Sequence, residues 1–91
     1  MSQLIKDTKV KQIDDKRYTL DVRGFACPYP QILVIAAMGE LQPDDVIEIT
    51  LDNPPSVRDI PPALERRGYE VLDIPRIDSL TWKIIVLNKR Q

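Results

Sequence analysis

The residue best suited to chemistry in this chain is Cys27, the only cysteine among 91 residues. Pro28 follows it directly, and Pro30 comes two residues later. Pro28 suits the first position of a helix because its φ is already helical and its missing N–H would be unpaired there. A helix that begins at Pro28 makes Cys27 its N-cap, where the helix dipole lowers the pKa of a thiol and makes it more nucleophilic.

Few N–H groups remain at this helix start to hold a thiolate. Pro28 and Pro30 have none, so we expect Tyr29 to be the main donor, with Gln31 as a second. Arg23, four residues before the cysteine, is a candidate for a nearby cation. Free cysteines are more commonly buried and inert. These residues alone therefore leave both a reactive thiol and a structural cysteine open.

The residues that the sequence lacks exclude several kinds of chemistry. There is no histidine, which removes Cys-His and Ser-His catalysis and the usual zinc ligand sets. A single cysteine forms neither an internal disulfide nor a redox pair. We therefore expect no metal site and no cofactor.

Charge and hydropathy limit the partners and the compartment. The net charge is −1, which gives no basic surface for nucleic acid. The longest apolar run, residues 32–38, is far shorter than the ~20 residues that cross a bilayer. A lone thiol suits a reducing compartment. We expect a cytoplasmic protein that binds neither nucleic acid nor membrane.

The elements that must position Cys27 can be predicted from periodicity and breaker residues. Strand patterns occupy four segments: 18–22, 46–51, 69–74 and 80–87. Helix patterns occupy 28–41 and 57–67, the second with Ser56 as N-cap and a bend or restart at Pro61-Pro62. The order β-α-β-α-β-β predicts an α+β fold: a two-layer α/β sandwich with two helices packed on one face of a four-stranded mixed sheet.

The chain length allows one domain. We assign residues 18–91 to it and residues 1–17 to a polar N-terminal extension. The alternation from Lys9 to Ile13 leaves open whether this extension adds a hairpin strand or stays peripheral.

The segment from Leu20 to Pro30 resembles the LDxRGLxCPxP signature of the TusA/SirA sulfur-carrier family. The likeness continues through residues 41–45, through 52–61, where the family has DDP followed by RDIP, and through 68–70. It covers about residues 18–88. The order and spacing of these motifs make the resemblance specific, which CPxP alone would not be.

The resemblance implies the same βαβαββ sandwich and a task for Cys27. It implies that Cys27 accepts sulfane sulfur as a persulfide from a donor such as a cysteine desulfurase or rhodanese-like protein. A downstream acceptor protein then receives the sulfur, in a sulfurtransferase-type transfer whose status as enzyme catalysis is left open. We expect five residues to support the persulfide: Arg23, Pro28, Tyr29, Pro30 and Arg58.

The chain departs from the family pattern beside the cysteine. Members that transfer sulfur typically carry basic residues eight and nine positions after it, where this chain has Ile35 and Ala36. A helix that is apolar all round, covered on one side by a sheet, exposes an apolar patch. We expect Ile32, Ile35 and Ala36 to dock a partner, together with Asn53, which replaces a family aspartate.

The same departures leave a second function open. It is a non-catalytic protein-binding or regulatory module that uses the apolar helix, with Cys27 as a helix cap or redox sensor. We expect a monomer or weak homodimer in either case. Asp44, where the family usually has a turn glycine, is expected to be tolerated at modest cost.

Overall fold

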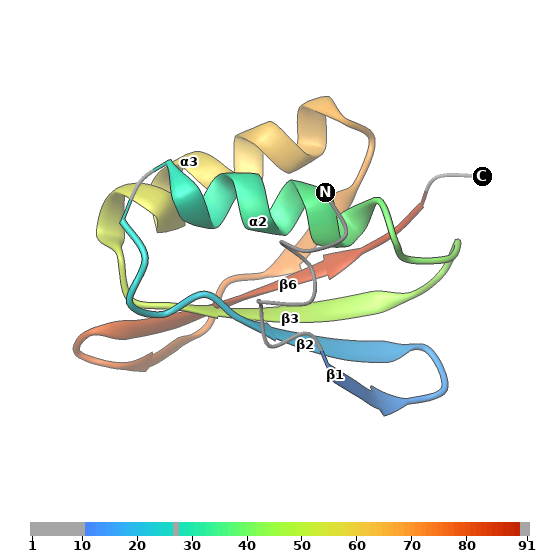
Figure 1. Ribbon diagram of the computed structural model, residues 1–91, viewed down its shortest axis with the longest axis horizontal. Helices are drawn as coiled ribbons and strands as arrows, with labels where there is room; N and C mark the ends of the chain where they lie inside the picture. Colours follow the sequence, from blue (N-terminus) through green and yellow to red (C-terminus); the bar gives the residue numbers. More distant parts are fainter. Residues whose placement is uncertain (1–10, 27, 90–91) are drawn as a thin grey trace.

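The structure, a computed structural model, describes residues 11–26 and 28–89. Along these residues the order of elements is β1 (Lys11–Asp14), β2 (Arg17–Asp21), α2 (Tyr29–Met38), β3 (Val46–Leu51), α3 (Pro54–Arg66), β4 (Glu70–Asp73), β5 (Arg76–Asp78) and β6 (Thr81–Leu87). The strands form one sheet, and α2 and α3 lie side by side on one of its faces (Figure 1).

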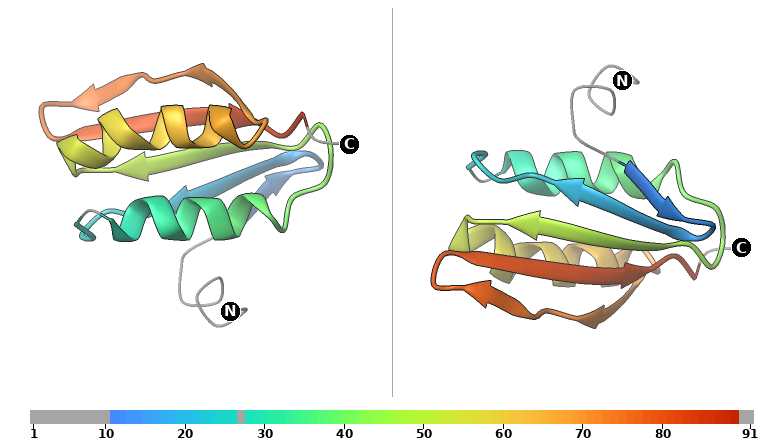
Figure 2. Two further views of the ribbon diagram at one scale, coloured as in Figure 1. Left: turned by 90° about the horizontal axis from the view of Figure 1, so that it is seen from above. Right: turned by 90° about the horizontal axis from the view of Figure 1, so that it is seen from below.

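The sheet has the order β1-β2-β3-β6-β4, with β5 also paired to β6. β2 and β3 are parallel, and the other pairs are antiparallel. Parallel neighbours need a crossover connection, which α2 provides. Because β2 and β3 end at the same side of the sheet, α2 and α3 both begin there (Figure 2). We call this side the exit end.

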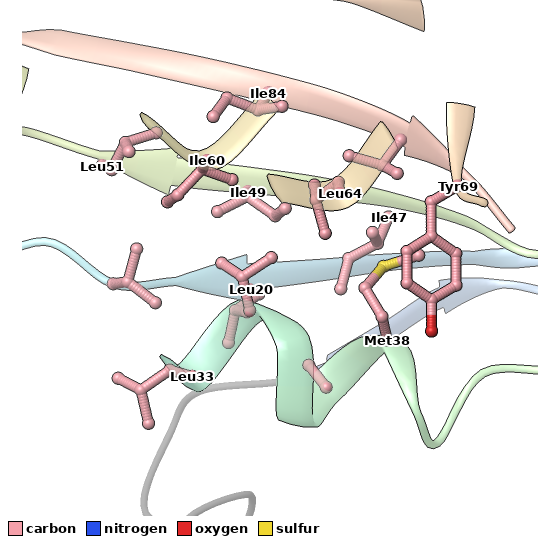
Figure 3. Packing of buried hydrophobic residues seen from close by; sticks show 14 residues of the cluster. Leu20, Leu33, Met38, Ile47, Ile49, Leu51, Ile60, Leu64, Tyr69 and Ile84 are labelled. Carbon is pink, nitrogen blue, oxygen red and sulfur yellow. The ribbon is translucent and has the colours of Figure 1, made fainter. Parts of the chain in front are cut away.

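The core fills the space between the sheet and the two helices (Figure 3). Alternate side chains of β2, β3 and β6 point into it, as the period-two patterns predict. The sheet residues that are fully buried are Leu20, Ile47, Ile49, Leu51, Ile84 and Val86. The helices cover them with Leu33, Val34, Ala37, Met38, Ile60 and Leu64. Burial of each large aliphatic side chain stabilises the fold by about 1.5–3 kcal/mol.

The predicted fold class is confirmed, with two short strands more than the four expected. β1 forms an antiparallel hairpin with β2, so the alternation before Tyr18 does mark a strand. Lys9 and Val10, which belong to that alternation, lie outside the described residues. β5 lies between the predicted strands 69–74 and 80–87, where no strand was predicted, and this segment pairs with β6.

Both helix starts differ from the predictions. α2 begins at Tyr29, with Pro28 as the N-cap residue. α3 begins at Pro54, and its N-cap is Asn53 rather than Ser56. Pro at the first helical position is favoured, so the helix starts at Pro54, before the predicted first residue at position 57.

The predicted restart of the second helix is wrong, because α3 continues through Pro61 and Pro62 to Arg66 as one helix. The predicted bend at these two prolines stays a prediction. The two prolines remove the N–H groups that would bond to the carbonyls of Val57 and Arg58. Pro62 and Arg58 are exposed and the other two residues only half-buried, so solvent can reach this side of the helix.

Both edges of the sheet contain bulges. The pairing register shifts between Gln12 and Asp14 in β1, at Ile13. On the opposite edge it shifts at Leu72 in β4 and at Ile77 in β5. All three bulged residues are large, apolar and exposed.

The connection from α2 to β3 is held by Asp45 and Asn88, both buried. An Asp45 carboxylate oxygen accepts the Gln42 N–H at 2.8 Å. The Asn88 side-chain amide donates to the carbonyls of Leu41 and Gln42 at 3.1 and 3.0 Å. Asp44 turns the chain with a φ of 73°, the one positive φ among the described non-glycine residues.

The face of the sheet opposite the helices carries a small charge network. Glu48 in β3 accepts hydrogen bonds from Arg17 in β2 and from Lys83 in β6, the latter at 3.2 Å. Partial burial acts to raise the pKa of Glu48, but these two hydrogen bonds and the two positive charges outweigh it and lower the pKa overall.

Candidate functional site

The candidate site surrounds the segment between β2 and α2, because this segment contains Cys27. Cys27 lies outside the described residues, so the site is built from its neighbours. Ala26 and Pro28, on either side of it in the chain, are both exposed. The segment therefore runs over the molecular surface at the exit end.

Two hydrogen bonds tie this segment to the one that follows β3. The Val22 N–H donates to the Thr50 carbonyl at 2.9 Å, which extends the ladder beyond β2. The Gly24 N–H donates to a carboxylate oxygen of Asp52 at 3.1 Å. Gly24 has a φ of 88°, and a Cβ there would meet no atom within 4 Å. Its requirement for glycine is therefore conformational rather than steric.

The start of α2 corrects two predictions about Cys27. The N-cap is Pro28, whose φ of −95° and ψ of 12° are not helical, so Cys27 precedes the N-cap position. The Tyr29 N–H donates to the carbonyl of Ala26 at 2.9 Å, so it is not available to a thiolate as predicted. With Pro28 and Pro30 lacking an N–H, the remaining first-turn donor is the amide of Gln31.

Arg23 is held by Asp21, the last residue of β2. Its Nε and Nη2 donate to the two carboxylate oxygens of Asp21 at 3.0 and 2.8 Å. The hydrogen bonds that Arg23 donates to Asp21 and the negative charge of Asp21 raise the pKa of Arg23, and the charges of Asp52 and Asp78 add to this. Arg23 is therefore surrounded by carboxylates, and a role of Arg23 toward the persulfide stays a prediction.

The predicted residues from α3 have partners of their own. Arg58 is mostly exposed and forms an ion pair with Asp59 at 3.2 Å. The Asn53 side-chain oxygen accepts the Ser56 N–H at 3.2 Å and the Ser56 hydroxyl at 2.8 Å, which is N-cap geometry. The structure thus gives Asn53 a structural task. A role of Arg58 toward the persulfide, and of Asn53 toward a partner, stays a prediction.

Exposed apolar side chains occur before and after Cys27 in the sequence. Phe25, Tyr29 and Ile32 expose 43%, 60% and 47% of their area, and we call these three residues the α2 patch. Ile35 and Ala36 are half-buried, and Ile35 packs against the core. Of the three helix residues predicted to form an exposed apolar surface, Ile32 is exposed, whereas Ile35 and Ala36 are only partly so.

Sequence reasoning missed three residues at the exit end. Phe25 was not singled out, although an aromatic residue in a loop after glycine is a signal for an exposed contact. Asp52 and Asp78 were missed as well. Asp52 directly follows a buried strand that ends beside β2, which is a usable signal. Asp78 reaches this end through the pairing of β5 with β6, and no local pattern indicates it.

The part of the chain that the structure describes shows neither a metal-binding cluster nor a membrane-spanning helix. No group of three or more histidine, cysteine, aspartate or glutamate side chains there could hold a metal ion. No helix there is long and apolar enough to cross a membrane.

Comparison with known proteins gives consistent matches. The family model described as "Sulfurtransferase TusA" matches residues 18–88. The chain is 40% identical over 69 residues to the "Putative sulfur carrier protein YedF" of Escherichia coli K12, covering 76% of this chain and 88% of that protein. It is 37% identical over 68 residues to a "Putative sulfur carrier protein" of Thermotoga maritima, covering 75% and 86%.

A solved structure supports the same relationship. The crystal structure of a SirA-like protein from Desulfitobacterium hafniense superposes with a TM-score of 0.69 at 25% sequence identity. The match covers 79% of this chain and 97% of that one. The two-layer arrangement is therefore shared across nearly the whole of the other protein.

Proposed function

Because this chain belongs to the sulfurtransferase TusA family, we propose that it is a sulfur carrier that binds sulfane sulfur as a persulfide on Cys27. The observation that carries the proposal is the position of the only cysteine. It stands between exposed neighbours at the exit end, directly before α2. A thiol in this position can enter the active site of another protein.

The proposed transfer needs only thiolate chemistry. The Cys27 thiolate attacks the outer sulfur of a donor persulfide, a new S–S bond forms at Cys27, and the donor's own S–S bond breaks. The electron pair of the broken bond leaves on the donor thiolate, and the hydrogen stays on the outer sulfur. An acceptor thiolate later attacks this sulfur and releases Cys27 as thiolate. No external oxidant or reductant is consumed, and no histidine base is required.

Activation of Cys27 is proposed to come from the start of α2. The dipole of a helix places about half a positive charge at its N-terminus, which favours an anion there. The Gln31 amide is the first-turn donor that can add a hydrogen bond. Arg23 contributes less than the sequence suggested, because Asp21 binds its guanidinium through both oxygens.

The α2 patch is proposed to contact the proteins that exchange sulfur with Cys27. These are a cysteine desulfurase or rhodanese-like protein as donor and a downstream carrier or enzyme as acceptor. Exposed apolar patches mark interaction sites. Phe25 is in the segment that contains Cys27, and Tyr29 and Ile32 are at the start of the helix that follows. We place the exchange in the cytoplasm, where a lone thiol stays reduced.

Mass spectrometry tests the proposal directly. The protein is incubated with a cysteine desulfurase and L-cysteine, and in parallel with a rhodanese and thiosulfate. We expect the mass to rise by one sulfur atom, the gain to disappear with dithiothreitol, and the Cys27→Ser variant to show no gain. A chain that gains no sulfur from either donor class would refute the carrier function.

A non-catalytic binding module remains the second candidate, because the α2 patch is exposed independently of any thiol chemistry. The version of this candidate in which Cys27 is the helix N-cap is wrong, since Pro28 occupies that position. Cys27→Ser separates the two candidates. A binding module keeps its partner affinity in this variant, whereas a carrier loses sulfur uptake.

A further inference from the structure

The turn between β5 and β6 presents a large apolar side chain where polar residues are usual. Leu80, in the turn, exposes 69% of its area, and Ile77, in the adjoining strand β5, exposes 52%. Tight turns normally carry glycine, asparagine, aspartate or serine at such positions. An exposed leucine at the tip of a hairpin therefore calls for an explanation other than turn geometry.

This turn is held rigidly by its own side chains. The Asp78 carboxylate accepts the Leu80 N–H at 2.9 Å. Arg76 donates to the carbonyls of Asp78 and Ser79 at 3.2 and 3.0 Å. The Arg76 guanidinium also lies 5.5 Å from the centre of the Trp82 ring. Leu80 is thus presented on a backbone that needs little further ordering when it is buried by a partner, which favours binding.

The turn lies at the exit end, the same end as the segment that contains Cys27 (Figures 1 and 2). Trp82 pairs with Leu51, the last residue of β3. Asp52, which follows Leu51, accepts the Gly24 N–H. The charges of Arg23 and Asp78 are close enough to shift each other's pKa. The hairpin and the β2–α2 segment therefore face the same approaching surface.

The α2 patch alone is too small for a specific interface. Two aromatic side chains and one aliphatic side chain, each about half exposed, offer on the order of 300 Å². A standard protein interface covers about 800 Å² on each partner. A protein that reaches Cys27 must therefore contact a further surface, and the rigid apolar turn is at the same end of the molecule.

We propose that the β5–β6 turn is a docking element in which Leu80 and Ile77 enter an apolar recess of the protein that delivers sulfur to Cys27. The inference rests on the proposed carrier function and adds a residue-level contact to it. Leu80 is the anchor, because it is the more exposed of the two and lies at the tip. Buried anchors of this kind typically account for a large part of the binding energy.

The test uses the donor that loads Cys27 most rapidly and compares second-order rates of persulfide transfer. We expect Leu80→Ser and Ile77→Thr each to slow transfer, Leu80→Ser by about tenfold, the effect of losing one anchor contact. Ile13→Thr is the matched control. Ile13 is also a bulged residue at a sheet edge and is 54% exposed, but it lies near the start of β2, away from the exit end.

Alkylation by iodoacetamide, a small neutral reagent, separates docking from effects on the thiol itself. We expect all three variants to alkylate at the wild-type rate. Transfer by Leu80→Ser at the rate of Ile13→Thr would overturn the proposal, and so would an equal loss of alkylation. If the wild-type protein were a dimer and Leu80→Ser a monomer with unchanged transfer, a second copy would cover the turn. That result would also overturn the proposal. Absence of loading in the wild-type protein instead refutes the carrier function on which the proposal rests.

Discussion

The turn after α2 allows a quantitative test through Asp44. Its φ of 73° lies in the left-handed region, which costs a residue with a Cβ roughly 1–2 kcal/mol. Glycine avoids this strain but loses about 0.5–1 kcal/mol more in conformational entropy on folding. The main-chain bond from the Asp44 N–H to the Asn88 carbonyl, at 2.7 Å, is kept by any replacement other than proline. Asp44→Gly should therefore stabilise the fold by about 0.7 kcal/mol.

The expected change is measurable by thermal and urea unfolding. A chain of this length has an unfolding entropy of about 0.2 kcal/mol/K, so the gain corresponds to a rise in Tm of about 4 °C. Two controls separate backbone strain from charge. Asp44→Asn removes the charge but keeps a side chain that tolerates this conformation, and Asp44→Ala keeps the Cβ without local polar contacts.

We expect the order of stability to be Gly above Asp and Asn, with Ala lowest. Asp44 is exposed and directly precedes the buried Asp45, so repulsion between the two carboxylates is the competing explanation for any gain. If Asp44→Asn and Asp44→Ala gave the same increase in Tm as Asp44→Gly, the gain would come from charge, and the argument from φ would be refuted.

Three further predictions concern polar side chains. Arg23→Gln should slow iodoacetamide alkylation of Cys27 by no more than about twofold, because Asp21 already pairs with the guanidinium and water screens the rest of its charge. A tenfold loss would mean direct contact and contradict the Asp21 pairing. Glu48→Gln should lower stability at pH 7 by about 1 kcal/mol. The pKa of Glu48 is lower in the folded protein than in the unfolded chain. The stabilisation by Glu48 is therefore present above its unfolded pKa of about 4.3 and is lost as the pH falls below that value, so the stabilities of wild type and variant should converge in acid. A constant difference in stability down to pH 2 would contradict this. Asn88→Asp should lower the free energy of unfolding by about 2–4 kcal/mol at pH 7, because a carboxylate would face two carbonyls. Part of this stability should return below the raised pKa of the new side chain, where the protonated acid can donate a hydrogen bond. Urea unfolding at pH 3 and pH 7 compares the protonated and the charged side chain.

The strands that carry the core could be predicted because each has one buried face. Tyr18, Leu20 and Val22 alternate with polar residues, and β2 appears at the predicted place. Prolines and the glycine after the first strand located the loop that holds Cys27. The local signals thus identified the sheet, the helices and the exposed thiol segment.

The contacts that shape the candidate site could be predicted only in part. The pairing of Arg23 with Asp21 is local and accessible from spacing, because Arg23 follows the end of β2 by two residues. The hydrogen bond from Gly24 to Asp52 joins residues 28 positions apart and depends on the parallel pairing of β2 with β3. The donation of the Tyr29 N–H to Ala26 depends on the exact turn before the helix, where Pro28 was expected to be helical and is not.

The bulges at Ile13, Leu72 and Ile77 determine how copies of this protein meet. A regular edge strand offers a continuous row of N–H and carbonyl groups to which another chain can add a strand. Here each outer edge loses its register after two residues or fewer, so an incoming strand finds no long ladder to extend. The molecule therefore resists growth into stacked, fibre-like assemblies. It does so although it exposes large apolar side chains, which contact with partner proteins requires.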